Sequence, residues 1–323
     1  MILKANNLTI GYGAKAVQQG LNLEAQARDL ICLTGTNGSG KSTLLRTLAG
    51  LQPALNGTIE IGGHNIASLN VHQRSTLFAL VLTDDIDIER LTVRELVAMG
   101  RFPYTNWAGV LSQKDNEIID KALKDVHLAH KADALINHIS DGEKQRAVIA
   151  KALTQDTPLV LLDEPTAHLD LPNRIEIMLL LRRLSVSTGK SFILSTHELD
   201  LALQMADKIW LMTPKGVEIG MPEDLMLTGS FQSAFGSESF SFDAIDGHCH
   251  IHHIKGPMKM AIVATEGAEA HEAWLRRALI RVGIQVDDTS NKKIYCTAQG
   301  YKFHECDTIY TTIAELLKNI FEH

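Results

Sequence analysis

Nine consecutive residues combine glycines, a lysine and hydroxyl side chains in a spacing suited to phosphate binding. They are Gly35-Thr36-Asn37-Gly38-Ser39-Gly40-Lys41-Ser42-Thr43. The glycines allow the backbone to curl so that successive N–H groups point at phosphate oxygens. In such a loop Lys41 reaches the β- and γ-phosphates, and the Ser42 hydroxyl binds Mg²⁺. The spacing therefore predicts a site for a nucleoside triphosphate with magnesium; the alternative is an ordinary glycine-rich turn.

Two carboxylates and a histidine follow apolar runs further along the chain. Asp163 and Glu164 come directly after residues 159–162, and His197 comes three positions after the end of residues 191–194. Beside a magnesium nucleotide, Asp163 would hold the metal, Glu164 would polarise the attacking water and His197 would contact the γ-phosphate. Taken singly, the acids could be a capping turn and the histidine a satisfied group at a strand end. Their order behind a phosphate loop favours catalysis.

Parallel strands are needed to bring these groups to one edge. Buried strands are predicted for the apolar runs at residues 30–34, 77–82, 159–162 and 191–194. Because the carboxyl ends of parallel strands meet at one edge, a shared rim is expected for Gly35, Thr83, Asp163 and His197. An antiparallel layer beside the nucleotide is predicted for residues 2–10 and 21–25, and a hairpin strand for residues 58–61. A mostly helical insertion is predicted for residues 112–153.

The end of the chain has the pattern of a separate small domain. Residues 255–257, Lys-Gly-Pro, form a plausible linker. Strands are predicted at 260–263, 284–286 and 294–297, and helices at 272–282 and 309–321. A chain of 323 residues exceeds what one hydrophobic core usually serves. We therefore expect two domains, residues 1–254 and residues 255–323.

Composition restricts the classes of partner. A formal net charge of −7, with 45% hydrophobic and 21% charged residues, gives no overall attraction to nucleic acid or anionic lipid. The four cysteines lie far apart with no C-x-x-C pair, which is typical of reduced cytosolic thiols. No apolar run is long enough to span a bilayer, and the first residues lack the plan of a signal peptide. Membrane contact is therefore expected only through a partner.

Six motifs in order resemble those of the ATP-binding-cassette (ABC) ATPases over about residues 1–250. The nine-residue loop resembles Walker A, residues 139–143 resemble the signature motif, and residues 159–164 resemble Walker B with its catalytic Glu164. Residues 167–170, ending in Asp170, look like the D-loop. His197 resembles the switch histidine, and Tyr12 the aromatic residue that stacks on adenine. The resemblance implies a P-loop NTPase core, mostly a parallel sheet with helices, with an antiparallel β layer and a helical insertion, followed here by a small C-terminal α/β domain.

The resemblance also implies a mechanism and its partners. Cassettes of this family pair head to tail, so that Ser140 and Gly142 of one copy complete the ATP site at Lys41 of a second copy. Closure on ATP and opening after hydrolysis would drive a multi-span membrane permease. The chain would then lie peripherally on the cytoplasmic side of the inner membrane. Residues 91–104 look like the corresponding stretch of bacterial importers for iron-siderophore, haem and cobalamin substrates.

The sequence departs from the family pattern at two places. Thr83 stands where the family carries the Q-loop glutamine, and its hydroxyl would contact Mg²⁺ with a shorter reach. Asp141 and Glu143 replace a glycine and a glutamine of the signature, which adds negative charge that Lys144 would partly offset. Because of these departures, a regulatory cassette protein that hydrolyses ATP weakly is one alternative function. A soluble ATP-switched clamp or scaffold is the other alternative to an importer subunit.

A histidine-rich stretch, Gly247-His248-Cys249-His250-Ile251-His252-His253, is a candidate metal site. On a strand, His248, His250 and His252 would share one face and could bind a transition metal or haem. The favoured alternative is a polar strand at a domain junction, because no carboxylate or spaced second ligand pair accompanies the histidines.

Overall fold

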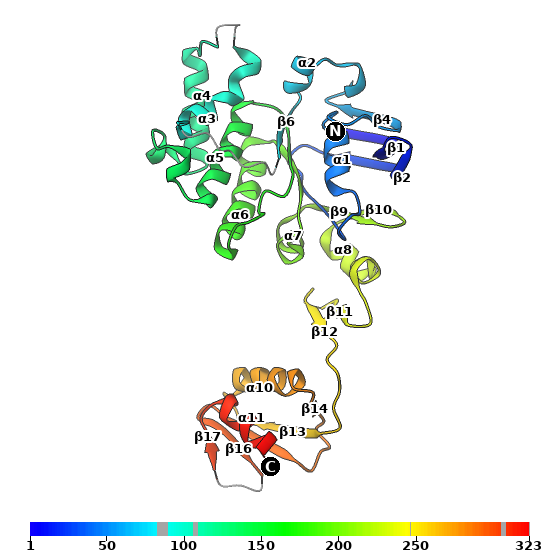
Figure 1. Cartoon of the computed structure of the whole chain (residues 1–323), viewed down its shortest axis with the longest axis vertical. Helices are drawn as coiled ribbons and strands as arrows, with labels where there is room; N and C mark the ends of the chain where they lie inside the picture. Colours follow the sequence, from blue (N-terminus) through cyan, green and yellow to red (C-terminus); the bar gives the residue numbers. More distant parts are fainter. Residues whose placement is uncertain (83–89, 106–108, 246, 305–307, 323) are drawn as a thin grey trace. The chain divides into compact units, whose positions relative to one another are not determined.

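The computed structural model describes residues 1–82, 90–105, 109–245, 247–304 and 308–322. The chain divides into two compact units (Figure 1). The first contains Met1–Gly236 and Phe242–His248, and the second contains Ser237–Ser241 and Cys249–His323. Each unit has its own hydrophobic core.

A six-stranded sheet lies in the middle of the first unit, in the order β10-β9-β3-β8-β7-β6. The strands are β3 (Leu30–Gly35), β6 (Phe78–Val81), β7 (Leu159–Leu162), β8 (Ser191–Ser195), β9 (Lys208–Thr213) and β10 (Gly216–Gly220). All pairs are parallel except β9 with β10, which form an antiparallel hairpin. Residues of β3, β7 and β8 are all buried because both faces of the sheet are covered, which explains their continuous apolar sequences.

A second, antiparallel sheet has the order β2-β1-β4-β5. Its strands are β1 (Leu3–Tyr12), β2 (Lys15–Ala25), β4 (Asn56–Ile61) and β5 (His64–Asn65). In Figure 1 this sheet lies next to α1 (Lys41–Leu48). The expected α/β fold with an antiparallel layer is therefore confirmed.

The remaining helices of the first unit range from 5 residues in α2 to 18 in α6, and most begin at a capping side chain. They are α2 (Val71–Ser75), α3 (Val93–Ala98), α4 (Gln113–Asp125), α5 (Asp141–Thr154), α6 (Leu171–Thr188), α7 (Leu199–Met205), α8 (Pro222–Leu227) and α9 (Ser230–Phe235). The 3₁₀ turns are η1 (Ile66–Ser68), η2 (Met99–Tyr104), η3 (Ala129–Lys131) and η4 (Ile136–His138). Capping boxes at Thr92, Ser112 and Ser140 fix the starts of α3, α4 and α5. The helical insertion expected over residues 112–153 thus consists of α4 and α5 joined by two 3₁₀ turns.

The two faces of the parallel sheet contribute to different cores. Along β3, Ile31 and Leu33 pack with α1 and the antiparallel sheet, whereas Leu30 and Cys32 pack with the helices α3 to α7. Alternation along the strand sends successive side chains to opposite faces. β3 is therefore buried on both sides, and the loop that follows it starts from a fixed position.

The second unit is built on a mixed five-stranded sheet, β14-β13-β15-β16-β17. Its elements are β13 (Lys259–Ala264), α10 (Glu269–Arg281), β14 (Gln285–Val286), β15 (Lys293–Thr297), β16 (Gly300–Phe303), β17 (Ile309–Tyr310) and α11 (Ile313–Glu322). Both helices contribute to its core, with Leu275 and Leu279 on α10 and Leu316 and Ile320 on α11. A short hairpin of β11 (Phe240–Phe242) and β12 (Cys249–Ile251) precedes this fold.

One expected helix begins later than the sequence indicated. The pattern predicted a helix over residues 309–321, but Ile309 and Tyr310 form β17, which pairs with Lys302 and Tyr301 of β16. Cross-strand pairing overrides the local helical pattern there. The sequence reading also missed β16 itself. Among the described residues, no helix has both the length and the apolar character required to cross a bilayer.

Candidate nucleotide-binding site

The loop between β3 and α1 depends on its glycines. Gly38 and Gly40 have φ of 77° and 104°, in the left-handed region that favours glycine. A Cβ on Gly40 would lie 2.7 Å from Cγ1 of Val17, and one on Gly35 would lie 2.5 Å from the carbonyl oxygen of Met212. No side chain caps α1. The positive end of the helix is therefore left for an anionic ligand.

Lys41 is held inside the loop. Its Nζ donates to the carbonyl oxygens of Gly35 (2.9 Å) and Thr36 (3.2 Å), and the residue is only 6% exposed. Burial lowers the pKa of the Lys41 ammonium, and the negative charges of Glu164 and Asp163 oppose part of this effect. The direct partners of this buried ammonium are neutral carbonyl oxygens, and a triphosphate in the loop would give it an anionic partner.

Asp163 lies at the centre of a group of oxygen atoms at the sheet edge. Its Oδ1 accepts hydrogen bonds from Ser42 Oγ (3.2 Å) and Ser195 Oγ (2.7 Å), and the residue is buried. A carboxylate beside a hydroxyl is the kind of oxygen set that Mg²⁺ binds together with phosphate oxygens. The donor chemistry of Ser42 and Asp163 therefore fits magnesium.

Glu164 occupies an unusual backbone conformation. Its φ is 45°, in the left-handed region, and its N–H donates to Ser195 Oγ (2.8 Å). Its Oε1 lies 2.9 Å from Nε2 of His197, and both side chains are partly exposed. Non-glycine residues in this region carry strain and cluster at functional sites. Sequence reasoning missed Ser195, which joins both acidic residues, because a buried serine at a strand end has no distinctive pattern.

A cavity of about 480 Å³ brings the loop together with Glu164 and His197. Of the expected residues, those lining it are Tyr12, Asn37, Gly38, Gly40, Lys41, Ser42, Thr43, Glu164 and His197. Tyr12 is 57% exposed, and its Oη lies 3.0 Å from Thr43 Oγ1. Its ring also lines an adjacent cavity of about 490 Å³ with Arg46 and Pro53. An exposed aromatic face beside a phosphate loop offers a stacking surface for a base.

Some expected site residues do not line this cavity, namely Gly35, Ser39, Ser140, Gly142, Asp163 and Asp170. Ser140 caps α5, and Asp170 caps α6 by accepting from the N–H of Asn173 (3.0 Å). Gly142 lies against α6, since a Cβ there would be 2.3 Å from Oδ1 of Asn173. Thr83, the candidate replacement for the Q-loop glutamine, lies outside the described residues.

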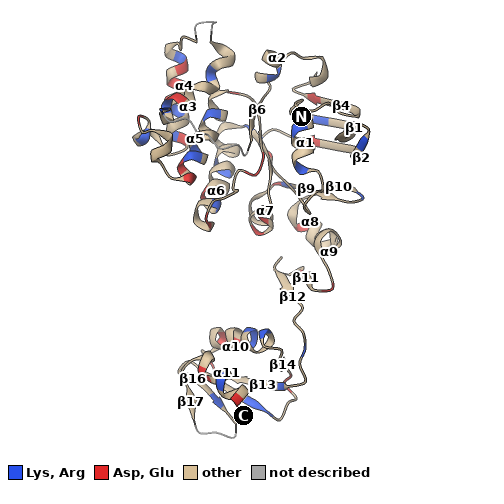
Figure 2. Ribbon diagram, in the orientation of Figure 1, with Lys and Arg blue, Asp and Glu red and all other residues tan. Residues whose placement is uncertain are grey.

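The two acidic signature residues both have lysine partners. Lys144 Nζ lies 2.9 Å from Asp141 Oδ1, and Lys131 Nζ lies 2.6 Å from Glu143 Oε1. The hydrogen bond from Lys131 lowers the pKa of Glu143. Figure 2 shows both signs of charge on α4 and α5. The negative charge that these substitutions introduce is therefore partly neutralised within the chain.

The histidine-rich stretch does not gather metal ligands. The described parts of the chain contain no group of three or more His, Cys, Asp or Glu residues placed to hold a metal ion. Both ring nitrogens of His252 have other partners, Ser241 Oγ at 2.9 Å and the carbonyl oxygen of Glu238 at 3.0 Å. Only residues 249–251 of the stretch form a strand.

A phosphate loop at the edge of a parallel sheet, with acidic residues after another strand of the same sheet, β7, defines a P-loop ATPase. Residues 18–167 match the family model described as ABC transporter, and residues 260–321 match the model described as iron ABC transporter C-terminal domain. An uncharacterised ABC transporter ATP-binding protein of Methanocaldococcus jannaschii is 34% identical over 248 residues, covering 76% of this chain and 86% of the relative. The chain therefore belongs to the ABC transporter ATP-binding proteins and is an ATPase of that family.

Two further relatives have substrates in their names. The ferric enterobactin transport ATP-binding protein FepC of Escherichia coli is 35% identical over 249 residues, covering 75% of this chain and 89% of the relative. The petrobactin import ATP-binding protein FpuC of Bacillus anthracis is 34% identical over 241 residues, covering 73% of this chain and 88% of the relative.

Solved structures agree with this family. A chain from an inward-facing metal-chelate type ABC transporter has a TM-score of 0.65 at 26% identity, covering 77% of this chain and 96% of that one. An ATP-binding cassette in a dimeric post-hydrolysis state with ADP and phosphate has a TM-score of 0.59 at 26% identity, covering 68% of this chain and 99% of that one.

Proposed function

We propose that this protein is the ATP-hydrolysing subunit of a membrane importer for iron-siderophore, haem or cobalamin-type substrates. The observation that carries the proposal is the cavity in which Lys41, Ser42, Glu164 and His197 meet beside an exposed Tyr12. The importer class is supported by the siderophore names of the relatives and by the match of residues 260–321 to an iron-transporter domain.

The proposed hydrolysis gives a role to each of five residues. Lys41 binds the β- and γ-phosphates, and Ser42 with Asp163 holds Mg²⁺. Mg²⁺, when bound, supplies positive charge that offsets the charge developing on the phosphates. Glu164 accepts the proton of the attacking water, and His197, 2.9 Å from its carboxylate, orients Glu164 and contacts the γ-phosphate.

A second copy of the chain is proposed to complete the site. Ser140, Gly142 and Asp170 lie outside the cavity around Lys41 of their own chain. In a head-to-tail homodimer they would contribute to the ATP site of the partner. The dimeric cassette structure among the similar proteins supports this arrangement.

The proposed membrane partner is a multi-span permease, and nucleic acid is not a proposed partner. The chain would act on the cytoplasmic side of the inner membrane, and its membrane contact would be through the permease alone. Residues 1–254 would form the cassette and residues 255–323 a domain with a regulatory or dimer-contact role. Thr83 in place of a glutamine favours one second candidate, a regulatory cassette protein that hydrolyses ATP weakly.

Copurification tests the importer proposal. A tagged chain, extracted with mild detergent from its own cells, is expected to bring down a multi-span membrane protein and to hydrolyse ATP faster in that complex. Recovery with a soluble partner and no membrane protein would reject the importer and favour the clamp or scaffold. Recovery with the permease but without stimulated hydrolysis would favour the regulatory alternative.

A further inference from the structure

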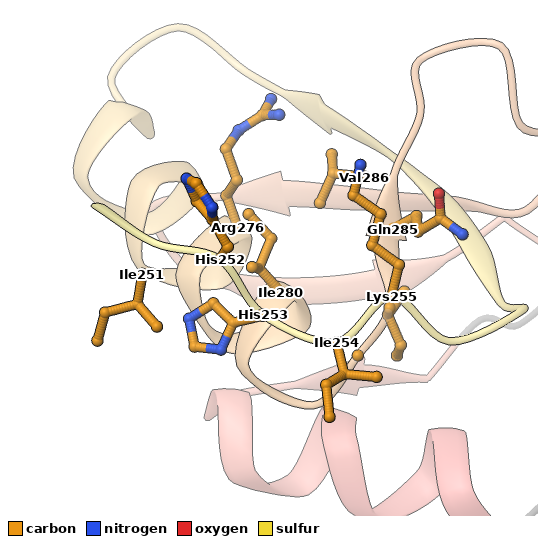
Figure 3. Close-up of a pocket in the computed structure, with 11 residues that line it drawn as sticks. Ile251, His252, His253, Ile254, Lys255, Arg276, Ile280, Gln285 and Val286 are labelled. Carbon is orange, nitrogen blue, oxygen red and sulfur yellow. The ribbon is translucent and has the colours of Figure 1, made fainter. Parts of the chain in front are cut away.

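The second unit contains a cavity of about 640 Å³ that contains none of the nucleotide-binding residues. One wall is the extended segment 251–255, and the other is formed by α10 and residues 283–286 (Figure 3). The segment is fixed there because the N–H of Gly256 donates to the carbonyl oxygen of Gly283 (2.7 Å) and Gln285 Nε2 donates to that of Gly256 (2.8 Å). A volume in this range is typical of small-molecule sites.

The ionisable lining residues are basic residues and histidines only. Lys255, His252 and His253 line the cavity from the extended segment, and Arg276 lines it from α10 (Figure 3). No Asp or Glu is among the lining residues. This contrasts with a chain whose net charge is −7. The lining therefore favours a ligand with negative charge.

The cations remain available to a ligand. Within the described chain, Lys255 has no hydrogen-bond or ion-pair partner. Arg276 pairs with Glu272 at 2.9 Å, but the two side chains are 42% and 32% exposed, and such surface pairs contribute little. A bound anion can therefore share or replace Glu272 as the partner of Arg276.

The end of α10 does not oppose an anion strongly. The last carbonyl groups of a helix carry partial negative charge when they are unpaired. Here the N–H of Gly283 donates to Ile280 O (3.0 Å) and that of Ile284 donates to Leu279 O (2.9 Å). These hydrogen bonds satisfy carbonyl groups in the last turn of α10, the helix that lines the cavity.

The walls between the charged groups are apolar. Ile251 is 66% exposed and Ile280 is 37% exposed, and Val286 is a further apolar residue of the lining. A compact inorganic anion would leave this surface unused, whereas an organic anion would cover it and gain free energy from its burial. We propose that this cavity binds a small organic anion with an apolar or aromatic body, whose charge pairs with Lys255 and Arg276.

Methyl NMR of the full chain with labelled isoleucines tests this proposal, with benzoate as the probe. Benzoate has one negative charge and an aromatic body, and the methyl groups of Ile251 and Ile280 report from the cavity walls. Their signals are expected to shift and saturate at millimolar benzoate, while that of Ile31, buried in the first unit, stays unchanged. Absence of a saturable shift at Ile251 and Ile280 would overturn the proposal.

Variants and matched probes separate charge from apolar contact. The double variant Lys255→Gln/Arg276→Gln is expected to weaken benzoate binding at least about tenfold, the loss typical of charge-assisted contacts. Lys318→Gln on α11 removes an exposed charge outside the lining and should change nothing. Unchanged binding in the double variant would overturn the proposal, as would equal affinity for inorganic phosphate or for neutral benzyl alcohol.

Discussion

Substitution of Glu164 by glutamine separates ATP binding from ATP hydrolysis. Glutamine has nearly the same shape, so the hydrogen bond to His197, now 2.9 Å from Oε1, can be kept with the amide. The change removes only the carboxylate that accepts a proton from water. General base catalysis contributes roughly 10²- to 10⁴-fold, so turnover should fall by that factor, which corresponds to about 3–5 kcal/mol in the barrier.

ATP affinity should be kept or increased in the same variant. The carboxylates of Glu164 and Asp163 both act on the buried Lys41, and they also repel a triphosphate bound beside it. Removing one of these negative charges therefore favours the bound nucleotide. With hydrolysis blocked, the variant is expected to accumulate as an ATP-bound dimer in size-exclusion chromatography.

The assay combines phosphate release with titration of a fluorescent ATP analogue. Glu218→Gln on the exposed part of β10 is the matched control, because it makes the same chemical change outside the cavity. The double variant Glu164→Gln/His197→Ala should be little worse than Glu164→Gln alone, since residues that act as a unit are not additive. Turnover of Glu164→Gln within a few-fold of wild type would refute Glu164 as the base.

Three other perturbations test the phosphate loop, a buried ion pair and a buried thiol. Gly40→Ala would place a Cβ 2.7 Å from Val17 at a φ of 104°, so ATP titration should show at least about tenfold weaker binding. Asp115→Asn leaves the buried guanidinium of Arg101, 2.7 Å away, without its carboxylate, and urea unfolding should show a loss of about 3 kcal/mol. Burial raises the pKa of the Cys32 thiol to about 12 from 9.0. The contribution of Cys32 to the free energy of unfolding is therefore complete below pH 9. Above pH 9 this contribution falls by up to about 1.4 kcal/mol per pH unit, and the same unfolding assay should show that Cys32→Ala has lost this part of the pH dependence.

Local sequence rules were sufficient for the phosphate loop and its neighbours. The conformations of Gly38 and Gly40 follow from glycine itself, and the apolar run of β3 fixes where the loop begins. The positions of Asp163 and His197 follow from the rule that parallel strands end at one edge. These features depend on residues close in sequence or on a general property of sheets.

Other features depend on contacts between distant residues and could not be predicted. Ser195 joins Asp163 to Glu164 only because β8 lies beside β7 in register. The left-handed backbone of Glu164 has no signal in its residue type. The two-residue strand β17 is defined by its pairing with β16, and its sequence alone reads as the start of a helix.

In the proposed dimer, the Ser140 hydroxyl must cap α5 and also donate to a phosphate of the partner's ATP, and its hydrogen bonds leave room for both roles. The hydroxyl oxygen accepts from the N–H of Glu143 at 3.3 Å, which uses one of its two acceptor positions. Its hydrogen remains available to donate to a phosphate oxygen from the partner. The carboxylate of Glu143 is meanwhile held by the N–H of Ser140 at 3.0 Å and by Lys131 at 2.6 Å, so its negative charge is partly neutralised within the chain. A signature with an acidic residue at this position therefore caps its own helix and leaves the Ser140 hydroxyl hydrogen for the phosphate that, in the proposed dimer, a second copy would hold.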